Sequence, residues 1–338
     1  MLLPKKVRRP GERSAFWLAL GAPLAATAGW MSYSALAVPH NMPLPPALNG
    51  ARRESNGRAG RMNYYVAGEG QPLLLLHSIN AAASPYEVRP VFEHYQGRRR
   101  VYAPDLPGFG FSDRSARPYS PRLYTDAIFD MLDVIEQETS VTAVDALALS
   151  LSAEFLARAA SEQPGRFRSL ALVTPTAFGK DDHWYGTAGS TRGSQTVRTI
   201  LDFGLWSRAL FDLLTSKPSL RYFLGQTFGS QDAIDQELLA YSYPSSHQQD
   251  AQHAPFAFVA GVLFSADISR VYESLELPVW LAYGTRGQFS DFGGMDSITA
   301  KPNWTTQAFP TGALPYYEQP ATFFDAYDQF LADVNKII

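Results

Sequence analysis

The pentapeptide Ala148-Leu149-Ser150-Leu151-Ser152 constrains the fold of this 338-residue chain more than any other feature. It ends an apolar run over 141–149 and opens a helical pattern over 151–160. This predicts a strand, a sharp turn with Ser150 at its tip, and a helix. The two backbones nearly touch in such a turn, so the positions two before and two after the serine need small side chains. Ala148 and Ser152 meet that need.

The segments around this turn alternate between strand-like and helical patterns. Alternation of this kind implies parallel βαβ units, so we expect the α/β class with a mostly parallel central sheet. The stretch 175–275 breaks the rhythm, because it is mostly helical and rich in aromatic residues. We interpret it as a cap inserted over the serine. The expected strands are 61–67, 73–77, 101–106, 141–149, 170–173, 279–283 and 305–309.

The N-terminal region has the pattern of a membrane segment. Five cations lie in residues 1–14, and the stretch 14–38 is uncharged. About 20 apolar residues span a bilayer, so we expect a cytoplasmic tail over 1–14 and one transmembrane helix over 15–38, with the main domain outside the cytoplasm. A signal peptide cleaved after Ala37, which gives a secreted protein, is the alternative. The proline-rich stretch 39–60 is expected to be a linker.

Small residues recur every four positions in this N-terminal stretch, at Gly21, Ala25 and Gly29. Such a stripe lets a second transmembrane helix approach closely, which makes a membrane partner one hypothesis. Simple alanine richness is the other explanation.

The composition excludes several function classes. A net charge of -3 argues against nucleic acid as a partner. The chain has no cysteine, which excludes disulfides and thiolate metal sites. His247 and His253 are six residues apart with no helical face in common, which is poor metal-ligand spacing. We therefore expect neither a metal nor a cofactor.

Three ordered motifs resemble those of the α/β-hydrolase superfamily over about residues 61–334. Leu76-His77-Ser78 resembles the His-Gly turn after the third strand of that family. The segment 103–113, which reads APDLPGFGFSD, is similar to the loop after its fourth strand, and the turn at Ser150 is similar to its nucleophile elbow. The resemblance implies a core formed by 61–174 and 276–338, with 175–275 as the cap.

The resemblance also implies acyl-transfer chemistry. Ser150 takes the position of the nucleophile. The backbone N–H groups of Ile79 and Leu151 take the positions that stabilise the oxyanion.

The acid and histidine positions of the family pattern hold other residues. Glycine (Gly287) stands where the carboxylate belongs, and Asp291 is the next candidate. Ala313 and Tyr316 replace the two histidines of the motif after the last strand. A phenol with a pKa near ~10 is a poor base at pH 7.

The remaining histidines leave three hypotheses open. No histidine follows His253, and the cap holds His183, His247 and His253. We expect a membrane-anchored protein with impaired catalysis, which binds an apolar small molecule or serves as an accessory subunit. The alternative is an active serine esterase or lipase-like enzyme, with a base from the cap (His253 or His247) and Asp291 as the acid. The third hypothesis is a structural partner with a collapsed pocket.

Overall fold

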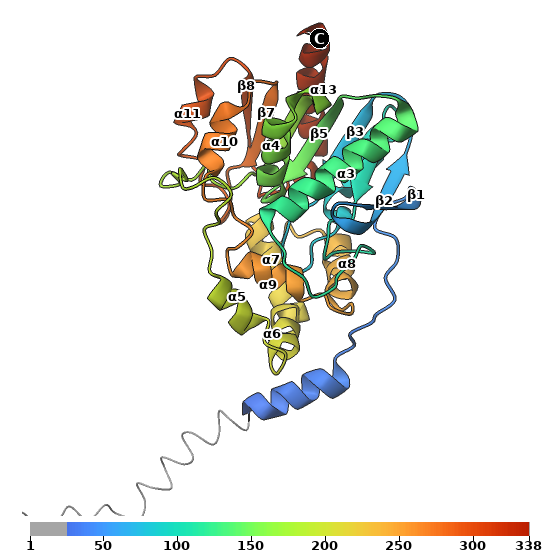
Figure 1. Ribbon diagram of the computed structural model, residues 1–338, viewed down its shortest axis with the longest axis vertical. Coiled ribbons are helices and arrows are strands. Elements are labelled where there is room, and N and C mark those ends of the chain that lie inside the picture. Colours follow the sequence, from blue (N-terminus) through green and yellow to red (C-terminus); the bar gives the residue numbers. More distant parts are fainter. Residues whose placement is uncertain (1–25, 338) are drawn as a thin grey trace, which may run out of the picture.

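The computed structural model describes residues 26–337, and its centre is an eight-stranded sheet in the order β1-β2-β4-β3-β5-β6-β7-β8 (Figure 1). β2 pairs antiparallel with β1 and with β4, whereas every pair from β4 to β8 is parallel. The mostly parallel sheet expected from the sequence is confirmed. The strands are β1 (Ala51–Gly57), β2 (Gly60–Ala67), β3 (Pro72–Leu76), β4 (Arg100–Pro104), β5 (Val144–Leu149), β6 (Phe167–Val173), β7 (Val279–Gly284) and β8 (Trp304–Phe309).

Helices cover both faces of the sheet, and a further group forms the cap below it in Figure 1. Those beside the sheet are η1 (Pro85–Val88), α2 (Arg89–Tyr95), α3 (Pro121–Thr139), α4 (Ser152–Glu162), η2 (Pro164–Arg166), α10 (Ile268–Ser274), α11 (Asp296–Thr299), α12 (Pro315–Glu318) and α13 (Pro320–Ile337). The cap helices are α5 (Gln195–Leu201), α6 (Ser207–Leu214), α7 (Lys217–Phe228), α8 (Gln236–Ser246) and α9 (His253–Val259).

The central strands are buried on both faces, because their side chains alternate between two cores. Leu74 and Leu76 of β3 pack in one core with α3 and α4. Leu73 and Leu75 pack in the other core with α2 and α13. This explains why the central strands read as continuous apolar runs in the sequence.

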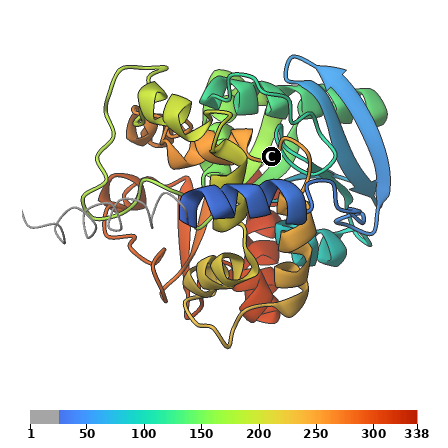
Figure 2. The ribbon, with the colours of Figure 1, turned by 90° about the horizontal axis from the view of Figure 1, so that it is seen from below.

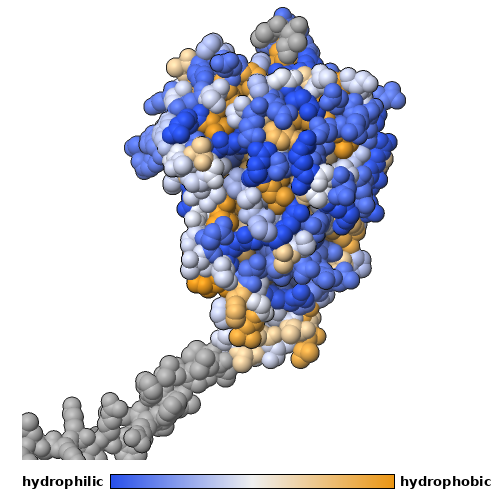
Figure 3. All heavy atoms as spheres, viewed as in Figure 1, coloured by the Kyte–Doolittle hydropathy of each residue, from blue (hydrophilic) through white to orange (hydrophobic). Residues whose placement is uncertain are grey.

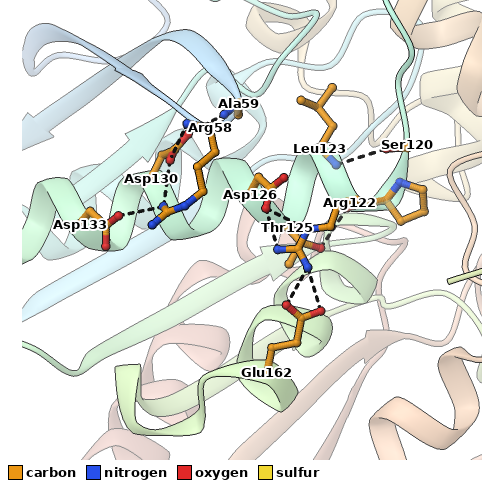
Figure 4. A network of polar contacts seen from close by, with 11 residues as sticks. Arg58, Ala59, Ser120, Arg122, Leu123, Thr125, Asp126, Asp130, Asp133 and Glu162 are labelled. Atoms are coloured by element: carbon orange, nitrogen blue, oxygen red, sulfur yellow. Dashed lines mark hydrogen bonds and ion pairs between the residues drawn. The ribbon is translucent and has the colours of Figure 1, made fainter. Parts of the chain in front are cut away.

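Polar contacts fix α3 against its neighbours (Figure 4). The Ser120 hydroxyl caps its start by accepting from the N–H of Leu123. Asp130 accepts hydrogen bonds from the N–H groups of Arg58 and Ala59, in the turn between β1 and β2. Arg122 joins α3 to α4 through an ion pair with Glu162 at 2.7 Å. These contacts hold the hairpin and α4 at fixed positions on one face of the sheet.

Two boundaries differ from those expected. The linker expected over 39–60 contains β1, an edge strand whose side chains are almost all exposed. Its polar sequence has no apolar alternation, so no strand pattern is visible in it. The cap expected over 175–275 includes α10, yet Ile268, Val271 and Tyr272 of α10 pack in the core with α4.

Residues 26–37 form a helix that lies against the cap, at the lower end of the molecule in Figure 1 and across the middle of the view from below in Figure 2. Across residues 26–337, no helix is both long and apolar enough to cross a membrane. The tail 1–14, the first part of the expected transmembrane helix 15–38, and Gly21 and Ala25 lie outside the described residues. Gly29 faces open space, with no atom within 4 Å of the position a Cβ would take.

Candidate active site

Ser150 sits at the tip of the turn between β5 and α4, as its motif predicts. Its backbone is in the left-handed region, with φ of 55°, a conformation that non-glycine residues rarely adopt. A hydrogen bond of 2.9 Å from its N–H to the carbonyl of Val173 in β6 fixes the turn. Strained backbone of this kind clusters at active sites. The Ser150 hydroxyl has no hydrogen-bond partner among residues 26–337 and lines a cavity.

The loop after β3 is tied to this turn by two buried side chains. The Ser152 hydroxyl donates to the carbonyl of His77 at 2.5 Å. The His77 ring lies within hydrogen-bond distance of the Ser78 carbonyl at 2.7 Å, and its other nitrogen accepts from the N–H of Leu106 at 3.0 Å. Burial lowers the pKa of His77 to about 3, so the ring is neutral. His77 therefore positions the loop and is not available as a base.

A buried carboxylate holds the next residues of the same loop. Glu87 of η1 accepts from the N–H of Ser78 at 2.9 Å, from the Ser78 hydroxyl at 3.0 Å and from the Asn80 amide at 2.7 Å. Burial raises the pKa of the Glu87 carboxyl, although these hydrogen bonds oppose the shift. Ser78, which replaces the glycine of the family motif, thus turns its hydroxyl to Glu87. Nothing in the sequence distinguishes Glu87 from an exposed helical glutamate, so sequence reasoning missed it.

The two expected oxyanion donors have unpaired backbone N–H groups in the described structure. Neither the N–H of Ile79 nor that of Leu151 has a hydrogen-bond acceptor within the described part of the chain. Ile79, Ser150 and Leu149 line the same cavity, and Leu151 follows Ser150 at the start of α4. The cavity measures about 420 Å³, a size typical of small-molecule sites, which range from about 300 to 1,000 Å³. The collapsed pocket of the third hypothesis is absent from the described structure.

The position expected for the acid has no room for a side chain. Gly287 has φ of 87°, and a Cβ there would lie 2.6 Å from the Cα of Gly229, at the end of α7. The side chain of Arg286 reaches the same helix end, donating to the carbonyl of Phe228 at 3.0 Å. Asp291 lines the cavity, but it is exposed and accepts from the backbone N–H groups of Lys180 and Gly293.

The loop after β8, where the family histidine belongs, is joined to α7 as well. The N–H of Ala313 donates to the carbonyl of Thr227 at 2.7 Å. A Cβ on Gly312 would lie 2.4 Å from the carbonyl carbon of Phe228. Tyr316 is fully buried, and its hydroxyl lacks a hydrogen-bond partner within residues 26–337. Burial, with Glu87 nearby, raises the pKa of Tyr316 well above its usual value, which excludes it as a base.

The cap histidines do not line the cavity that holds Ser150. His253 pairs with Asp202 at 2.7 Å, within the cap. His247 is buried within hydrogen-bond distance of the carbonyl of Tyr243 at 2.8 Å. His183 lines a neighbouring cavity of about 400 Å³. Of the two expected substitutes, Asp291 lines the Ser150 cavity and His253 does not.

The cap contributes a cation to the cavity wall. Arg192 lines the cavity and pairs with Glu154 of α4, which is fully buried. Glu154 also accepts from the Thr176 hydroxyl at 2.6 Å and from the N–H of Ser265 at 2.8 Å. Burial raises the pKa of Glu154, although Arg192 opposes the shift. This buried pair ties the cap to the helix that follows Ser150, a long-range contact that no sequence motif marks.

Comparison with known proteins agrees with this geometry. Residues 71–195 match the family model described as the alpha/beta hydrolase fold. The resemblance to the α/β-hydrolase superfamily that the motifs predicted is thus supported by the family model, by a curated relative and by the fold.

The more particular likeness is to named hydrolases. The chain is 28% identical to the 2-hydroxymuconate semialdehyde hydrolase of Pseudomonas putida over 165 residues, which are 47% of this chain and 56% of that protein. The match thus spans about half the length of that relative. A meta-cleavage product hydrolase from Pseudomonas fluorescens aligns with a TM-score of 0.64 at 18% identity, over 83% of this chain and 97% of the other. An esterase from Rhodococcus aligns with a TM-score of 0.63 at 20% identity, over 84% and 99%.

These findings correct the leading expectation from the sequence. We expected a membrane-anchored protein with impaired catalysis, acting as a ligand-binding or accessory subunit. The expectation of impaired catalysis in a subunit is wrong, because the curated relatives whose names state an activity are hydrolases. The expectation rested on the residues at the family's acid and histidine positions, Gly287, Ala313 and Tyr316. We took the absence of an acid and a histidine at these positions to mean that catalysis is lost.

Proposed function

We propose that the chain is a serine hydrolase that cleaves small, mainly apolar carboxylic esters through an acyl-enzyme on Ser150. The observation that carries this proposal is the turn at Ser150, where the hydroxyl lines a cavity beside the unpaired N–H groups of Ile79 and Leu151. These two donors would stabilise the oxyanion that forms when the serine attacks. The match to the family model and the hydrolase relatives support the same chemistry.

We further propose Glu87 as the group that accepts the serine proton. Three carboxylates line the cavity among the described residues, Glu87, Asp182 and Asp291, and only Glu87 is buried. Burial raises its pKa, which moves a carboxylate towards the range useful for a base near neutral pH. A carboxylate has about four acceptor positions, and three hydrogen bonds to Glu87 leave one for a proton.

In this mechanism Ser150 Oγ bonds to the acyl carbon while its proton passes to Glu87 through one water molecule, because the two side chains share no direct hydrogen bond. The ester C–O bond then breaks, and the departing alkoxide takes that proton. Water attacks the acyl-enzyme, again giving a proton to Glu87. This proton returns to Ser150 Oγ as the carboxylic acid leaves.

The residues of the cavity wall also suit a second class of substrate, in which the acyl group is apolar and carries one anionic end. Leu224, Leu238, Phe258 and Phe264 provide apolar wall, while Arg192 provides a cation. The name of the Pseudomonas putida relative specifies 2-hydroxymuconate semialdehyde as its substrate. That compound therefore belongs in the substrate panel beside neutral esters.

The test is hydrolysis by the purified full chain of p-nitrophenyl esters of increasing acyl length and of 2-hydroxymuconate semialdehyde. We expect turnover of short and medium esters, and labelling of Ser150 by a fluorophosphonate. The Ser150→Ala variant should lose both. Turnover that persists in Ser150→Ala, or a chain that neither hydrolyses any member of the panel nor reacts with the probe, would refute the proposal.

A variant in which His183, His247 and His253 are all replaced by glutamine separates the two possible bases. We expect this variant to keep its ester hydrolysis, because none of these rings lines the Ser150 cavity. Loss of activity with retained folding would assign the base to the cap instead of to Glu87.

A further inference from the structure

The end of the cap farthest from the sheet exposes an unusual amount of apolar surface. Of 14 large apolar side chains that are exposed in the described chain, 11 fall within residues 33–36 and 197–223. Figure 3 shows apolar surface at this lower end of the molecule. Large contiguous patches of exposed apolar surface are rare on soluble proteins, and they mark interaction sites. We define the cap-end patch as Ile200, Phe203, Leu205, Trp206, Leu210 and Leu213, which lie on α5, on α6 and in the turn between them.

The helix over residues 26–37 lies beside this patch (Figures 1 and 2). It is attached by Trp30, which donates to the carbonyl of Ala209 at 2.7 Å, and by Ser34, which donates to Asp212 at 2.5 Å. His40 also contacts Asp212, at 2.9 Å. Only one stripe of this helix faces the cap. Its other side is open, with Leu36 88% exposed, and it has no charged residue.

The sequence identifies what covers this surface. The uncharged stretch 14–38 leads directly into this helix, and five cations precede it: Lys5, Lys6, Arg8, Arg9 and Arg13. An apolar stretch next to a basic cluster is the pattern of an anchor to anionic lipid. The cap carries exposed cations at the same end, Lys217 and Arg221. Its two carboxylates in 195–228 are paired, Asp202 with His253 and Asp212 with His40.

We infer that the cap-end patch docks on the surface of an anionic phospholipid bilayer, with the helix over 26–37 lying at the interface. The apolar side chains enter the boundary between headgroups and acyl chains, and Trp206 lies at the depth that tryptophan prefers. A second copy of this chain fits the patch less well, because two such surfaces would bring Lys217 and Arg221 against their own copies.

Bilayer contact reaches the active-site cavity through α7. Tyr222 and Phe223 of this helix are exposed, while the next residues along it, Leu224 and Thr227, line the cavity that holds Ser150. One helix thus has an outer side toward the cap surface and an inner side toward the site. Docking places the cavity wall next to the phase in which apolar esters accumulate.

The test is co-flotation of the purified full chain with vesicles of phosphatidylcholine alone and with 30% phosphatidylserine, as a function of salt. We expect binding to vesicles that contain phosphatidylserine and a fall in binding at high salt. The triple variant Phe203→Ser/Leu205→Ser/Leu213→Ser should bind about tenfold more weakly or worse, since each side chain loses apolar contact. Tyr185→Ser removes an exposed aromatic side chain outside the patch; it is the control and should bind as the unchanged chain does.

Circular dichroism establishes that each variant is folded. Equal vesicle binding by the triple variant and the unchanged chain would overturn the inference, because the N-terminal stretch would then act alone. Light scattering tests whether a second copy of the chain covers the patch instead of a bilayer. A dimer that the triple variant abolishes, without vesicle binding by the unchanged chain, would assign the patch to a second copy.

Discussion

The loops after β3 and β5 and the loops after β7 and β8 form two ends of the site on the same sheet, and different contacts hold them in place. At the ends of β3 and β5, side chains do the positioning: Ser152 holds the His77 carbonyl, and Glu87 holds Ser78 and Asn80. At the ends of β7 and β8, the cap backbone fills the space, because α7 ends against Gly287 and Gly312. The helix end leaves no room for an acid side chain at Gly287, whereas the histidine positions hold the side chains of Ala313 and Tyr316. Neither Ala313 nor Tyr316 supplies a base at this end, so the proton acceptor that we propose, Glu87, lies at the other end.

The largest expected effect concerns Glu87. General bases contribute about 10²–10⁴-fold to rate, so Glu87→Gln should lower kcat/KM for ester hydrolysis by about 10²–10³-fold. The ionised carboxylate accepts the proton, so activity falls as pH falls through the pKa of Glu87, which burial places above its usual value. The measurement is the pH profile of kcat/KM for both proteins.

A purely structural Glu87 predicts a different result. The Gln variant would then lose activity equally at every pH and keep the acidic limb of the profile. Asp291→Asn is the matched control, since this carboxylate lines the same cavity but is exposed. We expect it to leave the acidic limb in place.

The next effect tests whether the end of α7 excludes an acid. Gly287→Asp restores the carboxylate of the family pattern, but its Cβ meets Gly229 and its φ is 87°. We expect a loss of about 2–3 kcal/mol in the free energy of unfolding, measured by urea denaturation, and no gain in hydrolysis. Gly97→Asp is the control, because a Cβ at Gly97 meets nothing within 4 Å. Equal stability of the two variants would show that α7 gives way to a side chain.

Ser152 offers a smaller effect at the other end of the site. Ser152→Ala leaves the buried carbonyl of His77 without its donor, which costs about 1–2 kcal/mol. We also expect a several-fold lower kcat, because the loop that carries the Ile79 N–H is less firmly held. Ser161→Ala removes a comparable bond on the exposed side of the same helix and is the control. An unchanged kcat in Ser152→Ala would mean that this bond does not position the loop.

The part of the fold built from repeated local patterns was predictable from the sequence. Continuous apolar runs such as 73–76 belong to strands buried on both faces, and the small residues around Ser150 mark its turn. β1 was not predictable, because an exposed edge strand imposes no apolar alternation on ARRESNG.

The site was predictable only where one short motif determines the backbone. The positions of Ser150, Ile79 and Leu151 follow from local sequence: Ser150 and Ile79 line one cavity, and Leu151 follows Ser150 in the chain. Glu87 and the Arg192–Glu154 pair depend on contacts between residues 9 and 38 positions apart. Position 287 has no room for a side chain because Gly229, at the end of α7, lies against it. Sequence spacing alone does not reveal that contact.

The smallest expected effect is that of the cap histidine nearest to a carboxylate. His253 is at the start of α9, and its pairing with Asp202 at 2.7 Å joins two parts of the cap without reaching the Ser150 cavity. His253→Gln should therefore change kcat/KM by no more than about twofold and lower stability by about 1 kcal/mol. Steady-state ester hydrolysis and thermal unfolding give both values. A drop of about 10²-fold or more in a folded variant is the size expected when a general base is lost. Such a drop would show that the proton acceptor is a cap histidine and not Glu87. The contrast between the two ends of the site would then be wrong.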